Sequence, residues 1–98
     1  MFSVDPGAVG VSSATEAGIG VAMAASTAAG SPAMIGVTAM GADPDSMMFA
    51  AGSNATGASY IGVAAEHAAQ RASFSGAQAL AAATTVGTEA IRAASLTL

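Results

Sequence analysis

The 98-residue sequence has no cysteine, no tryptophan and no lysine, and its only arginines are Arg71 and Arg92. The lack of cysteine excludes a disulfide framework and thiolate chemistry. Two arginines cannot neutralise a run of phosphates, so we expect neither nucleic-acid binding nor attraction to anionic lipid. The net charge of −4 makes the chain weakly acidic.

Side chains that could carry catalysis are few and scattered. His67 is the single histidine, and Glu66 beside it would project about 100° away on a helix. Neither a second histidine nor a cysteine is present to complete a metal site. The serines lie in no G-x-S-x-G motif, and residues 18–20 lack the third glycine of a dinucleotide-binding loop. We therefore expect no enzyme, no cofactor and no metal, and interpret Glu66 and His67 as a solvent-facing polar patch.

Alanine and glycine dominate what is present, with 28 and 12 copies respectively. The hydrophobic fraction of 53% therefore overstates the material for a core, because an alanine methyl buries little area. At about 25 cal/mol per Å² of buried apolar surface, the few larger residues would struggle to offset the ordering entropy of the chain. We expect a helical chain that completes its core against another protein.

A first helix is expected over residues 6–29. Asp5 can cap it, and Pro6 suits its first turn. The run Gly30-Ser31-Pro32 predicts its end, because glycine suits the position after a helix and proline cannot continue one. A stripe of mostly small residues recurs along this helix at three- and four-residue steps: Val4, Ala8, Val11, Thr15, Gly18, Ala22, Ala25 and Ala29.

A second, longer helix is expected over residues 44–83 or beyond, after a connector at 30–43. Asp43 as cap, Pro44 at the first position and Asp45 in the first turn are typical of a helix start. Glycines interrupt this helix at positions 52, 57, 62, 76 and 87, at a cost of about 1 kcal/mol each relative to alanine. Packing could compensate for them, or some could mark the close approach of another backbone. The sequence leaves both interpretations open.

The expected fold is all-α, an antiparallel two-helix hairpin forming one domain over residues 1–98. Two helices share one seam, so a hairpin that is apolar on more than one side should self-associate or bind another helical protein. Large apolar or aromatic residues of the second helix do point in several directions: Met47, Met48, Phe49, Tyr60, Ile61, Val63, Phe74 and Leu80.

Residues 17–42 carry no charge and are long enough to span a bilayer. They consist mostly of alanine, glycine, serine and threonine and are interrupted at 30–32, so we expect no integral membrane insertion. A cleavable signal peptide needs a positive region ahead of its apolar core. No lysine or arginine precedes Arg71, so we expect no cleavable signal peptide.

Several segments in a fixed order carry a family resemblance over nearly the whole chain. They are the opening VDPGAV at 4–9, GIG at 18–20, the alanine-rich run to SP at 31–32, the turn GADPDS at 41–46, the aromatic residues Tyr60 and Phe74, and the close at 84–94. Together they resemble the PE family of mycobacteria.

That resemblance implies a helical hairpin that pairs lengthwise with two helices of a PPE-family partner, giving a heterodimeric four-helix bundle. It also implies delivery of the pair, through a chaperone that holds the PPE protein, to a type VII (ESX) secretion system. The expected location is the cytoplasm before export and then the cell envelope, cell surface or exterior. The PE module is expected to be non-catalytic.

Two departures from the family pattern affect these expectations. Gly7 follows Pro6 where the family has the glutamate of its naming Pro-Glu pair. The segment 84–98 is signal-like, but the tyrosine-x-x-x-acid export signal falls on Thr85 and Glu89, so the acid is kept and the aromatic ring is lost. We interpret this signal as degenerate.

For pairing, we expect the contact surface to include two residues of the first helix and five of the second: Ile19, Met23, Met48, Phe49, Ile61, Phe74 and Leu80. The alternative is a self-assembling helical bundle without an export function, in which the small-residue stripe of the first helix packs against its own copy.

Overall fold

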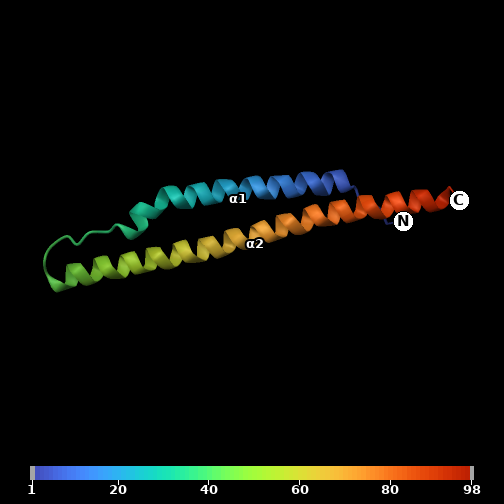
Figure 1. Cartoon of the computed structure of the whole chain (residues 1–98). Helices are drawn as coiled ribbons and strands as arrows, with labels where there is room; N and C mark the ends of the chain where they lie inside the picture. The colour runs from blue at the N-terminus through green and yellow to red at the C-terminus, as the bar shows by residue number, and fades with distance from the viewer. Residues whose placement is uncertain (1, 98) are drawn as a thin grey trace. The chain divides into compact units, whose positions relative to one another are not determined.

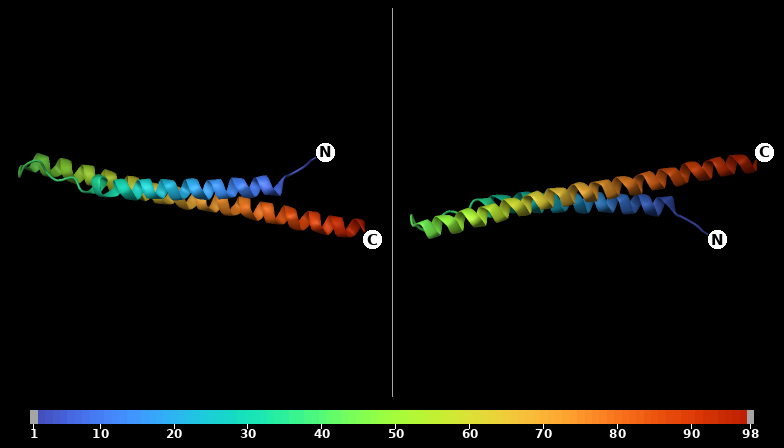
Figure 2. Two further views of the ribbon diagram at one scale, coloured as in Figure 1. Left: turned by 90° about the horizontal axis from the view of Figure 1, so that it is seen from above. Right: turned by 90° about the horizontal axis from the view of Figure 1, so that it is seen from below.

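The computed structural model describes residues 2–97 and contains two helices, α1 (Pro6–Ile35) and α2 (Pro44–Leu96). Figure 1 shows α1 in blue to teal and α2 in green to red, and Figure 2 gives two further views of the pair. The chain divides into two compact units. Unit 1 combines α1 up to Gly20 with α2 from Gln70 onward, and unit 2 is Val21–Ala69. The predicted all-α helical hairpin is confirmed.

The two helices are antiparallel within each unit. In unit 1, Ser12 of α1 contacts Gln78 of α2, whereas Glu16, further along α1, contacts Arg71, earlier in α2. In unit 2, Met34 of α1 lies against Gly57 of α2, whereas the connector residue Val37, further along the chain, contacts the earlier Asn54. Residue numbers therefore increase along α1 where they decrease along α2, as in an antiparallel pair.

Each helix begins at the predicted cap. The Asp5 carboxylate accepts hydrogen bonds from the backbone N–H groups of Gly7 (2.9 Å) and Ala8 (3.2 Å). The Asp43 carboxylate accepts from the Ser46 backbone N–H (2.9 Å) and from the Ser46 hydroxyl (2.8 Å). These bonds satisfy N–H groups that have no partner inside a helix.

The predicted end of the first helix at residue 29 is wrong, because α1 continues through Gly30, Ser31 and Pro32 to Ile35. Proline removes the helical N–H that would bond to the carbonyl four residues earlier, and the Ser31 hydroxyl donates to a different carbonyl, that of Thr27, at 2.7 Å. The last turn also packs on α2, where Met34 lies against Gly57. Packing of this turn therefore outweighs the local stop signal, and the connector shortens to residues 36–43.

The second helix is longer than its predicted minimum and continues to Leu96. The signal-like segment 84–98 is therefore helical as far as that residue, while Leu98 lies outside the described part of the chain. By length and composition α1 could cross a membrane, a test that helices in the cores of soluble proteins and signal sequences also pass.

The face of α2 that meets α1, here called the seam, follows alternating steps of three and four residues. This spacing is typical of helices packed as in a coiled coil. From residue 50 onward, nearly all the buried or half-buried residues of α2 lie on it: Ala50, Asn54, Gly57, Ile61, Ala64, Ala68, Arg71, Ser75, Gln78, Ala82 and Thr85.

The matching seam of α1 has the same spacing: Pro6, Val9, Ser13, Glu16, Gly20, Met23, Thr27, Gly30 and Met34. All of these except Met23 are buried or half-buried. The small-residue stripe noted in the sequence, from Val4 to Ala29, lies on a different face, and every member of it is exposed.

Candidate functional site: an uncovered helical surface

The hairpin encloses almost no apolar core. Within residues 2–97 the buried side chains are Ala50 at 7% exposed, Ser75 at 8% and Ser13 at 9%. Large apolar and aromatic residues instead lie on the outside along both helices, among them Val11, Val21, Met48, Phe49, Tyr60, Val63, Phe74, Leu80 and Ile91. The chain alone therefore leaves unburied most of the apolar area that would stabilise a fold.

A reciprocal pair of serines joins the two helices in unit 1. The Ser13 hydroxyl donates to the Ser75 carbonyl at 2.8 Å, and the Ser75 hydroxyl donates to the Ser13 carbonyl at 2.9 Å. The two hydroxyl oxygens are 3.3 Å apart. Small side chains let the backbones approach, and the two bonds fix which residues face each other.

Charged and amide groups flank this serine pair. Arg71 Nη2 lies 2.8 Å from Glu16 Oε2, and both side chains are about three-quarters buried. Gln78 Nε2 donates to the Ser12 hydroxyl at 2.9 Å. The seam of unit 1 is thus held largely by polar contacts. Sequence reasoning missed it because a search for apolar periodicity passes over serine, glutamate and arginine.

In unit 2 the backbone of the chain approaches α2 closely. A Cβ added to Gly57 would lie 2.0 Å from the Met34 carbonyl oxygen, so only glycine fits there. The Asn54 amide clamps the next residues of the connector, accepting from the Val37 N–H at 2.9 Å and donating to the Val37 carbonyl at 3.0 Å.

This resolves the two interpretations of the α2 glycines. Gly57 marks a close backbone approach within the hairpin. The other four face open space in this chain, since an added Cβ would meet nothing within 4 Å: Gly52, Gly62, Gly76 and Gly87.

Two flanks lie on either side of the α2 seam, and they differ in side-chain size. The leading flank consists of the residues immediately before seam residues. Its large apolar or aromatic members are Phe49, Tyr60, Val63 and Phe74, and it also carries the polar side chains of His67 and Gln70. The trailing flank consists of the residues immediately after them. From position 51 to 83 it contains only alanine and glycine: Ala51, Ala55, Ala58, Gly62, Ala65, Ala69, Ala72, Gly76, Ala79 and Ala83.

The residues predicted to contact a partner fall on different faces. Phe49, Phe74 and Ile19 lie on the leading flanks of their helices and are exposed. Ile61 and Met23 occupy seam positions, where Ile61 is half-buried by α1.

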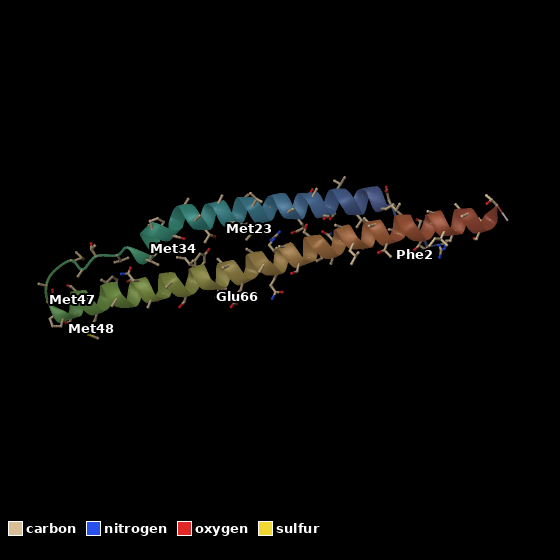
Figure 3. The ribbon with its side chains drawn as sticks, in the orientation of Figure 1. Phe2, Met23, Met34, Met47, Met48 and Glu66 are labelled. Atoms are coloured by element: carbon tan, nitrogen blue, oxygen red, sulfur yellow. The ribbon has the colours of Figure 1, made fainter. Side chains whose placement is uncertain are left out.

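The remaining two predicted contact residues lie away from the leading flank. Met48 lies beside Met47 in the first turn of α2 (Figure 3). Leu80 is exposed on the side of α2 opposite the seam. Glu66 shares that helical position and projects away from α1 in Figure 3.

The signal-like residues also lie on α2. Thr85 is the last half-buried residue of the seam, and its hydroxyl donates to the Ala81 carbonyl at 2.9 Å. Glu89 is exposed and pairs with Arg92 at 2.8 Å, three residues further on. The acid is therefore accessible, whereas position 85 is partly covered.

Glu66 and His67, the acid–imidazole neighbours, are both exposed on α2. Among residues 2–97 no three His, Cys, Asp or Glu side chains gather into a group that could hold a metal ion. What each unit offers chemically is exposed apolar surface, a feature typical of sites of protein–protein contact.

Comparison with known proteins bears on what this surface is for. The chain matches no curated protein and no solved structure. The sequence profile of the PE family, however, matches residues 2–93, which is nearly all of the hairpin described above. The chain therefore belongs to the PE family.

Proposed function

We propose that this PE-family chain is a non-catalytic subunit that pairs with a PPE-family protein as a helical heterodimer. Each protein contributes two helices to a four-helix bundle, and the pair is the unit that a type VII (ESX) secretion system exports. Family membership supports this role, and the uncovered apolar surface of the hairpin is the observation that carries it.

The size of the exposed surface supports an obligate partner. The chain exposes 6988 Å² at a mass of 9.2 kDa. A folded monomer of that mass exposes about 4,900 Å² by the usual scaling. The excess of about 2,000 Å² is comparable to what one partner loses in an obligate interface, which buries roughly 2,000–5,000 Å² over both partners.

The composition of the seam points the same way. Its buried residues are serine and alanine, which bring little apolar area out of water. Burial of large side chains is the main favourable term in folding. A hairpin held by a serine pair, an ion pair and an asparagine clamp needs a second protein to bury its aromatic residues.

Export is the second part of the proposal. We place the pair at the mycobacterial cell envelope or outside the cell, reached through the secretion machinery and the chaperone of the PPE protein. Exposed Glu89 supplies the acid of the export signal in this chain. Thr85 in place of tyrosine makes that signal weaker, so the partner contributes to recognition.

Self-assembly is the alternative, and one observation favours it. The small-residue stripe of α1, from Val4 to Ala29, is exposed at every member, so a second copy could pack there. In that case the isolated chain forms a defined dimer or tetramer and needs no other protein.

Co-expression with a PPE-family protein, followed by size exclusion, separates the two functions. Pairing predicts a 1:1 complex and an aggregated or poorly folded chain when the partner is left out. A defined homo-oligomer of the isolated chain that ignores the PPE protein would contradict pairing and support self-assembly.

A further inference from the structure

We infer that the partner covers the leading flank of the hairpin and leaves the trailing flank free. This inference rests on the proposed pairing and adds the face and the chemistry of the occupant. The occupant is an antiparallel pair of helices with an uncharged contact face, whose large side chains lie over α1 and whose small side chains lie over α2.

Side-chain size distinguishes the two flanks of α2. Tyr60 and Phe74, both on the leading flank, are 58% and 54% exposed. An aromatic side chain brings roughly 150–250 Å² to an interface when it is buried. The trailing flank offers only methyl groups and hydrogens from residue 51 to 83. Covering the leading flank therefore removes far more apolar area from water.

The angle between seam and flank suits a four-helix bundle. Neighbouring residues of a helix diverge by about 100°, so each leading-flank residue faces about 100° from the seam residue that follows it. In a four-helix bundle each helix contacts two neighbours at roughly right angles to each other. The seam of α2 meets α1, and the leading flank is oriented to meet a third helix.

The leading flank of α1 lies on the same side of each unit. Because the helices are antiparallel and both are right-handed, residues that precede the seam on α1 and on α2 turn toward one side. On α1 these residues are mostly small: Ala8, Ser12, Thr15, Ile19, Ala22, Ser26, Ala29 and Ala33. Ile19 is the single large member.

The chemistry of the occupant follows from this asymmetry. Close packing needs large groups opposite small ones, so the helix over α1 must carry bulky apolar residues. The helix over α2 must leave room for Phe49, Tyr60, Val63 and Phe74. The leading flank of α2 carries no Asp, Glu, Lys or Arg between residues 49 and 84. Charged groups of the occupant are therefore expected only at its edges.

The absence of cysteine permits a direct test with one matched pair of variants. Ala77 and Ala79 lie on either side of the seam residue Gln78 and are both exposed in the free hairpin. Ala77→Cys places a thiol on the leading flank, and Ala79→Cys places the same thiol on the trailing flank. Each variant is co-purified with the PPE protein and treated with a maleimide, and the labelling rate of this chain is followed by intact mass.

A second matched set uses charge and gives one position in each unit. Tyr60→Glu and Phe74→Glu place a carboxylate on the leading flank, and Ala58→Glu and Ala72→Glu place it on the trailing flank. Burying an unpaired charge is strongly unfavourable. We expect the first two variants to weaken pairing on the order of 100-fold and the second two to change it less than about threefold.

We expect the Ala77→Cys thiol to be labelled at least tenfold more slowly than the Ala79→Cys thiol in the complex. Equal rates, or protection of Ala79→Cys alone, would overturn the inference while leaving pairing intact. Failure of the unaltered chain to form any complex with the PPE protein would instead remove the proposed function, and the inference with it. The two failures are therefore distinguishable.

Discussion

Single hydrogen bonds and single glycines determine how the two helices of this chain meet. Ser13 and Ser75 exchange hydroxyl-to-carbonyl bonds across unit 1. Gly57 admits the Met34 carbonyl in unit 2. Neither contact buries much apolar area. At the residue scale, the pairing of the helices is therefore determined by a close backbone approach and by polar contacts more than by an apolar core.

Ser75→Ala should destabilise the complex by about 1 kcal/mol, because it removes one interhelical hydrogen bond and leaves the packing nearly unchanged. Urea unfolding of the complex measures the loss as a lower midpoint. Ser73→Ala is the matched control, since Ser73 is exposed on the same helix. Equal effects of the two variants would show that the serine pair is not a stabilising contact.

Gly57→Ala and Gly62→Ala should have opposite effects. A Cβ at position 57 would lie 2.0 Å from the Met34 carbonyl oxygen, whereas a Cβ at position 62 meets nothing within 4 Å. Overpacking costs about 1–3 kcal/mol, while replacing an unobstructed helical glycine by alanine gains up to about 1 kcal/mol. Thermal unfolding of the co-purified pair should show a lower Tm for the first variant and an equal or higher one for the second. A higher Tm for Gly57→Ala would contradict the close approach.

Because Asp43 caps α2, the stability of the first turn of this helix depends on pH. Hydrogen bonds from the Ser46 backbone N–H and then from the Ser46 hydroxyl hold the pKa of the Asp43 carboxyl below its ordinary value of 3.8. A lowered pKa in the folded state means that the cap is fully effective above about pH 4 and is lost as the pH falls through the lowered value. The protection of the Ser46 and Met47 amides from exchange, taken relative to the intrinsic exchange rate at each pH, should therefore fall in acid.

Ser46→Ala provides the control for this pH effect, because it removes the hydroxyl donor and keeps the backbone N–H. The acid transition at the start of α2 should then shift to higher pH. An unchanged transition would mean that the hydroxyl of Ser46 has no part in lowering the Asp43 pKa.

At the scale of elements, helix starts follow from local chemistry and helix ends do not. Asp5 and Asp43 cap the helices that the sequence predicts, because a cap needs only side chains and N–H groups a few residues apart. The end of α1 depends instead on Met34 meeting Gly57, residues that lie far apart in the sequence. Sequence reasoning therefore stopped the helix at Gly30-Ser31-Pro32, before its true end at Ile35.

The seam shows a second limit of sequence reasoning. A search for apolar periodicity finds large apolar residues, or small ones that recur at helical spacing. In the first helix it found the stripe from Val4 to Ala29, which is exposed in the structure. The true seam contains Ser13 and Glu16, whose burial depends on Ser75 and Arg71 of the other helix. The presence of an exposed apolar surface could be predicted from Phe49, Tyr60 and Phe74. Its division into two flanks of unlike side-chain size could not, because the flanks are defined only once the residues of the seam are known.

At the scale of the whole molecule, the chain exposes more surface than a folded monomer of its mass. Its accessible surface of 6988 Å² exceeds what a monomer of its mass exposes by about 2,000 Å². Its acids lie at helix starts, in the seam, on the side opposite the seam and, as Glu89, near the end of α2, whereas neither flank of α2 carries an acid between residues 49 and 84. Under the proposed pairing, burial of this surface against the partner supplies the apolar burial that the hairpin alone lacks.

Export is proposed for the pair of proteins as a whole. Thr85→Tyr should raise secretion, since it restores the tyrosine four residues before Glu89, and Glu89→Ala should lower it. Culture-filtrate immunoblots against a cytoplasmic marker measure both. Thr88→Tyr adds the same ring to the exposed surface without the four-residue spacing and should have no effect. If Thr85→Tyr and Glu89→Ala both leave secretion unchanged, the signal lies elsewhere, for example on the partner.

Unfolding of this chain with and without a PPE-family protein, followed by circular dichroism, tests the proposed pairing. We expect a broad, non-cooperative transition or aggregation for the chain alone, and one cooperative transition with helical signal from both proteins for the pair. A monodisperse monomer that melts cooperatively by itself, with a Tm unaffected by the PPE protein, would contradict it.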